Sequence, residues 1–205
     1  MAGCDGQPSI ERNIMNKSNI NYSGIIGCAI LYAVTSFASA FIGFLNPWCW
    51  IVVFPILAAI LGAPSYLWAA SRWQRLGVAT LFALILSVVL LVMGEIDFTQ
   101  ALLMVAVGIV SDVVRQAIGN THKRSILLAY PVLPLGIIAW LMKLWTNSEW
   151  YYQGAAEEIG ADYADGLRTL SSIWALLLVI VLTLAVGYIG IRIAAAKMKS
   201  GKKLG

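Results

Sequence analysis

Charged residues are scarce in this sequence. Only 12% of its 205 residues are Asp, Glu, Lys or Arg, 60% are apolar, and the mean hydropathy is +0.81. About a quarter of the residues in an ordinary soluble domain are charged. The composition therefore argues against a soluble enzyme or binding domain. It predicts an integral membrane protein with one domain and almost no soluble part.

The residues that carry most enzyme chemistry are also few. There is one histidine, His122, which lies in a short basic loop, and the three cysteines are far apart in the sequence. The sequence has no His-Glu-x-x-His motif, no Gly-x-Ser-x-Gly motif and no phosphate-binding loop for ATP. We therefore predict that the protein is not an enzyme. We expect no catalytic residue, no metal site and no intrinsic cofactor.

Six apolar stretches are each suited to cross a bilayer as a helix, which takes about 20 residues. They cover residues 24–44, 48–73, 76–93, 98–118, 126–145 and 169–193. The sequence therefore predicts an all-α membrane protein with six transmembrane helices. Because proline kinks helices, pairs of prolines in the second and fifth stretches suggest helices that bow around a cavity. The alternative is ordinary helix irregularity.

The Lys and Arg residues gather on one side of these predicted spans. Of the fourteen, only Lys143 and Arg168 fall in the odd-numbered gaps between spans. Short cytoplasmic loops are rich in Lys and Arg, so we expect both termini in the cytoplasm. Residues 1–23 and 197–205 are then cytoplasmic tails of a transmembrane domain at 24–196. The net charge of +4 follows from this orientation and does not indicate nucleic-acid binding.

The gaps expected outside the membrane are acidic and aromatic. Trp and Tyr gather at membrane interfaces in any case, but these gaps hold more of them than anchoring needs. Sites for small organic molecules are mostly apolar and aromatic, with a few polar groups. We therefore predict an outward-facing substrate pocket. Its candidate residues are Asn46, Trp48, Trp50, Glu95, Asp97, Trp145, Trp150, Tyr151 and Tyr152.

Two pairs of residues are candidates for docking a partner protein. Ala29 and Ala33 have the four-residue spacing of small side chains that lets transmembrane helices approach closely. The same spacing also suits packing inside one bundle. Asp112 and Arg115 share a helix face near the inner end of the fourth span. They form either a local ion pair or a contact with a partner.

Several segments resemble the Trep_Strep family of bacterial membrane proteins. The first is GAPSYLW followed by Arg72, Arg75 and Gly77, at residues 62–77. The second is SDVVR at 111–115, and the third is SILLAY at 125–130. The fourth is YADGLRTL followed by Trp174, at 163–174, with a Lys-rich tail after it. The likeness covers nearly the whole chain after residue 18. Members of this family look like S components, the substrate-binding subunits of energy-coupling factor (ECF) transporters.

This resemblance implies a six-helix S-component bundle in the bacterial cytoplasmic membrane, with a ligand pocket that opens outward. It implies three partner subunits, a coupling transmembrane protein and two ABC-type ATPases, and the ATPases would use the ATP. Ala29 and Ala33 match the seam that meets the coupling protein in such subunits. The loaded subunit would topple in the membrane and release its ligand inside.

The ligand class and two rival functions stay open. The substrate expected from the resemblance is a micronutrient, such as a vitamin, a vitamin precursor or a tetrapyrrole-like ring system. A cationic ligand is also compatible with outer gaps that are acidic and aromatic. The rivals are a small carrier or channel that works alone, and a structural membrane protein without a ligand.

Overall fold

The structure is a computed structural model that describes residues 22–73, 76–119 and 123–201, and side chains up to residue 198. Among these residues there are helices and short connections but no strand. The all-α prediction is therefore confirmed. His122, Arg75 and most of the two predicted tails lie outside the described residues.

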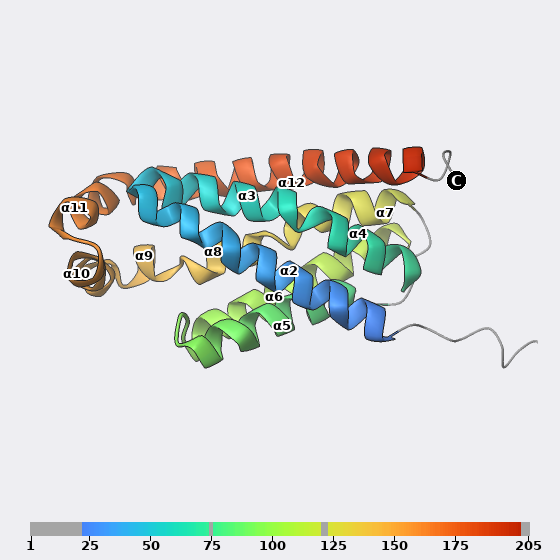
Figure 1. Ribbon diagram of the computed structural model, residues 1–205, viewed down its shortest axis with the longest axis horizontal. Coiled ribbons are helices and arrows are strands. Elements are labelled where there is room, and N and C mark those ends of the chain that lie inside the picture. The colour runs from blue at the N-terminus through green and yellow to red at the C-terminus, as the bar shows by residue number, and fades with distance from the viewer. Residues whose placement is uncertain (1–21, 74–75, 120–122, 202–205) are drawn as a thin grey trace, which may run out of the picture.

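The helices lie mostly along one axis of an elongated bundle (Figure 1). The long α12 (Ile173–Gly201) lies beside α3 (Phe54–Leu61), and α5 (Val78–Met93) and α6 (Phe98–Ile118) form an antiparallel pair. Helix α2 (Tyr22–Ala40) packs against both α3 and α5. It therefore joins the two halves of the bundle.

The two ends of the bundle differ. The start of α2 and the end of α12 lie together at one end (Figure 1). Helices α10 (Ser148–Glu158) and α11 (Ala161–Leu170) lie at the other. The longest predicted gap between spans is thus a pair of helices rather than an irregular loop.

Within the described residues, four helical stretches are long and apolar enough to cross a membrane. They are Tyr22–Leu45, Cys49–Arg72, Phe98–Ile118 and Ile173–Met198, and they correspond to the predicted first, second, fourth and sixth spans. The predicted third span is the shorter apolar helix α5, of 16 residues. An integral membrane protein with several apolar helices is what these lengths support.

The predicted fifth span, 126–145, is not one continuous helix. It is divided into α7 (Lys123–Ala129), the 3-10 turn η3 (Tyr130–Val132), α8 (Leu135–Trp140) and α9 (Lys143–Thr146). Pro131 and Pro134 each lack the backbone N–H that a helix needs, and both lie at the interruption. The broken backbone is enclosed by protein, since Tyr130, Leu133 and Ile137 are buried. Irregular backbone at membrane depth is tolerated in that setting.

The predicted second span has a milder irregularity. It begins with a π-helical turn, η2 (Cys49–Val53), continues as α3, and restarts at α4 (Ala63–Arg72). Pro55 and Pro64 occupy the first turns of α3 and α4, where proline is accommodated because those N–H groups have no partner within the helix. These two prolines therefore mark the points where a helix starts again.

A cluster of aromatic rings holds the centre of the bundle. Tyr66 lies 5.2 Å from Tyr130 and 5.8 Å from Phe82, and Tyr32 lies 5.4 Å from Phe82, measured between ring centroids. All four side chains are fully buried. They come from α4, η3, α5 and α2, so this cluster joins the broken segment to the continuous helices.

Candidate ligand-binding site

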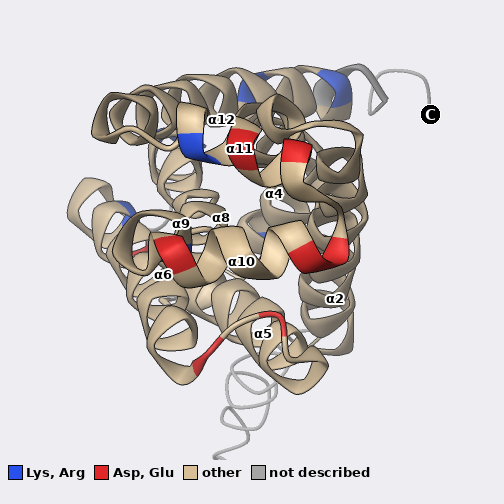
Figure 2. Ribbon diagram, turned by 90° about the vertical axis from the view of Figure 1, so that its left-hand side faces the viewer, with Lys and Arg blue, Asp and Glu red and all other residues tan. Residues whose placement is uncertain are grey.

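One end of the molecule is acidic. Viewed toward α10 and α11, Asp and Glu residues gather on those two helices and on the turn between α5 and α6 (Figure 2). Every acidic residue in the described part of the chain, apart from Asp112, is in these segments: Glu95, Asp97, Glu149, Glu157, Glu158, Asp162 and Asp165. Only Lys143 and Arg168 balance them there.

A cavity of about 420 Å³ lies beneath α10 at this end. That volume is within the range of sites for small organic molecules. The cavity is lined by Gly43, Phe44, Trp50, Met93, Gly94, Glu95, Gln100, Trp140, Lys143, Trp150, Tyr151, Gly154, Ala155, Glu158, Ile159, Tyr163 and Leu167. These residues come from eight helical elements and the turns beside them, so the site exists only when the whole end of the bundle is folded.

Helix α10 turns one face to the cavity. Trp150, Gly154 and Glu158 are spaced four apart, and Tyr151 and Ala155 repeat the spacing one residue later. Residues at this spacing lie on one side of a helix. The same geometry keeps the next residue, Tyr152, out of the cavity.

Aromatic side chains form the inner wall. The indole N–H of Trp50 donates a hydrogen bond to the Tyr151 hydroxyl oxygen at 2.6 Å, and Trp140 meets Trp50 edge to face with ring centroids 6.2 Å apart. A side chain on Gly43 would reach within 2.1 Å of the Trp50 ring, so only glycine lets that ring sit against the backbone. Burial raises the pKa of Tyr151 well above its usual range. Its hydroxyl therefore stays protonated and able to donate.

Lys143 ties three segments together at the rim. Its ammonium group lies 3.3 Å from a carboxylate oxygen of Asp97 and 4.6 Å from the ring centre of Trp150. Asp97 also caps α6, because its side chain accepts the backbone N–H of Gln100 at 2.9 Å. That hydrogen bond, followed by Lys143, holds the pKa of Asp97 below its usual value. The charge of Lys143 is thus already matched before any ligand binds.

Two glutamates face the cavity without a matched cation. Gly94, in a left-handed conformation at φ 80°, ends α5 and places Glu95 at the rim; Glu158 comes from α10. Loss of solvent, followed by repulsion from Glu158, raises the pKa of Glu95. Among the described residues, no Lys or Arg lies within salt-bridge distance of either carboxylate. The cavity is therefore aromatic inside and negatively charged at its rim.

The second cation of this end, Arg168, is also engaged. It lies 3.2 Å from Glu149 and 3.6 Å from Asp165, and above the Tyr152 ring. These contacts tie α11 to α10 on the side away from the cavity. Within the described residues, no three His, Cys, Asp or Glu side chains come together as a metal site would need.

The sequence matches the model of a known protein family. The model of a family described as hypothetical bacterial integral membrane proteins, Trep_Strep, matches residues 24–200. The chain belongs to the Trep_Strep family. No curated protein and no solved structure matches it. Membership supports an integral membrane protein, in agreement with the apolar helices.

Four of the nine predicted pocket residues of this Trep_Strep protein line the cavity. They are Trp50, Glu95, Trp150 and Tyr151. Asp97 does not line the cavity, but it forms an ion pair with Lys143, which does. The remaining four do not line the cavity.

The four outlying residues have other roles. Asn46 accepts the backbone N–H of Cys49 at 2.9 Å and so starts the π-helical turn, whereas Trp48 is exposed on the surface. The Trp145 indole donates to the Ser172 carbonyl oxygen at 3.3 Å, and the Tyr152 hydroxyl is hydrogen bonded to Ser171. The last two contacts fasten α9 and α10 to the start of α12.

Sequence reasoning missed several residues of the cavity. Trp140 and Gln100 lie in predicted membrane spans. Tyr163 lies in a segment that stands out in the sequence only for its family likeness. Its hydroxyl donates a hydrogen bond to the Gly43 carbonyl oxygen at 2.8 Å. Burial raises the pKa of Tyr163 to about 12. The prolines before Trp140 were the available signal, since a broken span can turn toward a cavity.

Asp112 and Arg115 of this Trep_Strep protein face the interior. Asp112 is 3% exposed and accepts the backbone N–H groups of Ala79 and Thr80, at 3.1 and 2.9 Å, at the start of α5. Arg115 is 0% exposed and donates to the carbonyl oxygens of Ala70 and Trp73, at 2.8 and 2.9 Å, at the end of α4. An anion at a helix start and a cation at a helix end both stabilise the helix. The pair therefore clamps the junction between α4 and α5.

Ala29 and Ala33 also face inward. They are 0% and 3% exposed, because α2 packs this side against its own bundle. The outward side of α2 carries the larger residues Ile26, Ile30 and Val34. In this conformation the Ala-x-x-x-Ala spacing serves packing within the chain.

Proposed function

We propose that this protein is the substrate-binding S component of an ECF-type importer. It captures a micronutrient from outside the cell and carries no ATPase of its own. The observation that carries the proposal is the cavity of about 420 Å³ under α10, at the end of the bundle away from the start of α2 and the end of α12. A structural protein has no need of such a space.

The chemistry of the cavity suits reversible capture of an organic molecule. Its walls are the rings of Trp50, Trp140 and Trp150, with Glu95, Glu158 and the Tyr151 hydroxyl as the placed polar groups. Rings bury large apolar areas, and a few polar groups fix the orientation of the ligand. Residues of α10 and α11 form one side of the cavity.

The transport step belongs to partner subunits in this proposal. The family likeness supports a coupling transmembrane protein and two ABC-type ATPases that hydrolyse ATP, with six spans and both termini in the cytoplasm. The outward residues of α2, including Ile26 and Val34, are the open surface of that helix for the coupling protein. Ala29 and Ala33 would contact it only if α2 separated from its neighbours during toppling.

Transport in liposomes tests the proposal. The purified chain alone, loaded with the micronutrient that native mass spectrometry identifies in it, is expected to move none across the membrane. The chain with coupling protein, ATPases and ATP is expected to import it. Uptake by the lone chain at the same rate would instead favour a self-sufficient carrier. A protein that never holds a small molecule would favour a structural role.

A further inference from the structure

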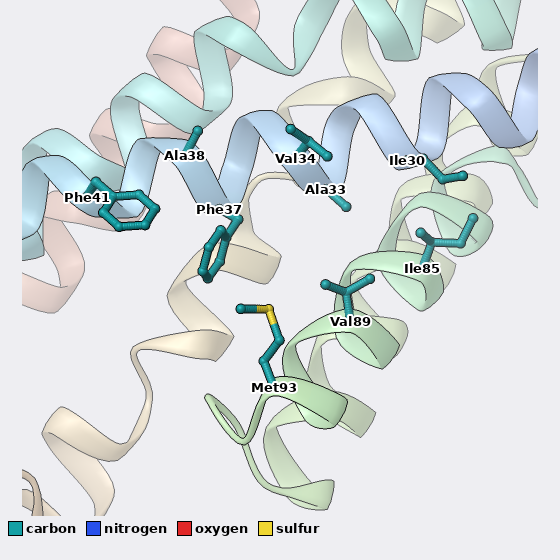
Figure 3. A pocket seen from close by; sticks show the side chains of 9 residues that line it. All are labelled: Ile30, Ala33, Val34, Phe37, Ala38, Phe41, Ile85, Val89 and Met93. Atoms are coloured by element: carbon teal, nitrogen blue, oxygen red, sulfur yellow. The ribbon is translucent and has the colours of Figure 1, made fainter.

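A second cavity, of about 220 Å³, opens between α2 and α5 (Figure 3). All of its lining residues are apolar: Ile30, Ala33, Val34, Phe37, Ala38, Phe41, Ile85, Val89 and Met93. Helix α2 belongs to a candidate membrane span. This groove therefore lies at the depth of the hydrocarbon and can hold only an apolar group.

The groove and the outer cavity adjoin each other. Met93 lines both of them. The chain passes from Phe41 in the groove to Gly43 in the cavity on one side, and from Met93 to Glu95 on the other. Two walls of the groove thus continue as walls of the cavity.

Two side chains lie where the two spaces adjoin. Phe37 and Met93 point toward one another between α2 and α5 (Figure 3). Phe37 also stacks on Trp140 of the outer cavity, with the rings 4° from parallel and their centroids 6.4 Å apart. Methionine is flexible and adapts to different neighbours. A rotation of Met93 would join the spaces without moving a helix.

The charges at the outer end select the other half of a ligand. Lys143 is paired with Asp97, and Arg168 with Glu149 and Asp165. Glu95 and Glu158 remain at the cavity with no such partner among the described residues. The aromatic faces of the cavity wall also attract cations. An anionic head group would meet repulsion here, whereas a cationic one would be stabilised.

We propose that the outer cavity and the α2–α5 groove form one site for an amphiphilic cation, whose charged head lies beside Glu95 and Glu158 and whose apolar part lies in the groove. This inference rests on the proposed capture function, because it names the class of molecule captured. Entry from the outer leaflet through the groove is a consequence of the same geometry.

Two probes that differ only in chain length test it. Benzyltrimethylammonium offers the head alone, and 6-phenylhexyltrimethylammonium adds five methylene groups. Binding is measured by calorimetry with the protein in phosphatidylcholine nanodiscs, and empty nanodiscs give the blank. Each methylene removed from water strengthens binding about fourfold. We expect the long probe to bind at least ~10-fold more tightly than the short one.

Substitutions in the groove separate it from the membrane around it. Val89→Phe fills the groove and is expected to abolish most of the advantage of the long probe while leaving the short probe unchanged. Val88→Phe is the matched control. Val88 directly precedes Val89 in α5, is exposed, and lines neither space. Ala38→Phe fills the groove from α2 and is a second variant should Val89→Phe fold poorly. Glu95→Gln should weaken both probes.

The outcomes are distinct. Equal effects of Val88→Phe and Val89→Phe on the long probe would overturn the role of the groove. Failure of both cations to bind to a protein that native mass spectrometry shows holding another small molecule would overturn the ligand class and leave the capture function standing. Absence of any bound molecule would count against both.

Discussion

The two ends of this bundle use charged side chains in opposite ways. At the end where α2 starts and α12 finishes, Asp112 and Arg115 are buried, and each bonds to two backbone positions at a helix terminus. At the other end, Glu95 and Glu158 line a cavity and have no cationic partner in the described structure.

The difference distinguishes charged groups that hold the fold together from charged groups that can contact a ligand. A buried charge is costly unless it is paired and hydrogen bonded, so the inner pair is committed to the α4–α5 junction. A charge at the rim of a cavity keeps part of its water, and it can exchange that water for a ligand. We therefore expect charge at the α4–α5 junction to affect folding, and charge at the cavity to affect binding.

The largest expected effect comes from breaking the inner clamp. Arg115→Ala leaves the carbonyl oxygens of Ala70 and Trp73 without their charged donor, and a buried polar group left unsatisfied costs about 1–3 kcal/mol, or roughly 2–6 kcal/mol for the two. We expect the free energy of unfolding in detergent to fall by about that amount. Arg72→Ala, at an exposed site on the same helix junction, should change it little. Similar losses for the two variants would mean that the buried contacts of Arg115 contribute no more to stability than those of an exposed arginine.

A smaller loss of stability is expected at Ala29. Ala29→Trp forces a large ring into the packed interface between α2 and the bundle, and overpacking costs about 1–3 kcal/mol. Ile30→Trp, on the neighbouring exposed position, should be tolerated in lipid. Thermal unfolding of both variants distinguishes packing from docking. If Ala29→Trp left the midpoint unchanged but prevented co-purification with the coupling protein, the surface of α2 would differ from this structure.

At the outer end, substitution should alter affinity rather than stability. Trp150 and Trp48 are 56% and 54% exposed, but only Trp150 lines the cavity. We expect Trp150→Ala to weaken binding of benzyltrimethylammonium about 10-fold, in line with the value of a well-placed aromatic contact. Trp48→Ala should have no effect. Calorimetry in nanodiscs measures both, and equal losses would remove α10 from the site.

The comparison also shows which parts of the structure can be predicted from sequence. Composition and apolar runs predict the all-α class and the four long helices, because hydrophobic length is a local property. The interruption of the fifth stretch was not predictable, since the sequence does not tell whether its prolines kink a helix or divide it. That depends on whether neighbours such as Tyr66 and Phe82 enclose the freed backbone groups.

The candidate site was only partly predictable for the same reason. Acidic and aromatic residues at the outer end could be found from the sequence, but Tyr151 and Tyr152 are adjacent and only the helix of α10 decides which faces the cavity. Trp140 comes from a stretch assigned to the membrane. Asp97 shows that a correctly placed residue can act through another, since it fixes Lys143 and does not itself line the cavity.

The smallest expected effect is a dependence of binding on pH. The groups that face Glu95 at the cavity are Glu158, Lys143 and the hydroxyls of Tyr151 and Tyr163, and burial together with Glu158 raises the pKa of Glu95. A cation favours the ionised carboxylate. As pH falls through the raised pKa, Glu95 takes up a proton and affinity for benzyltrimethylammonium should decline a few-fold, at a pH above the usual range for glutamate, about 4.3. Glu95→Gln should bind more weakly and lose that part of the pH dependence. A decline that persists unchanged in Glu95→Gln would contradict the role of Glu95.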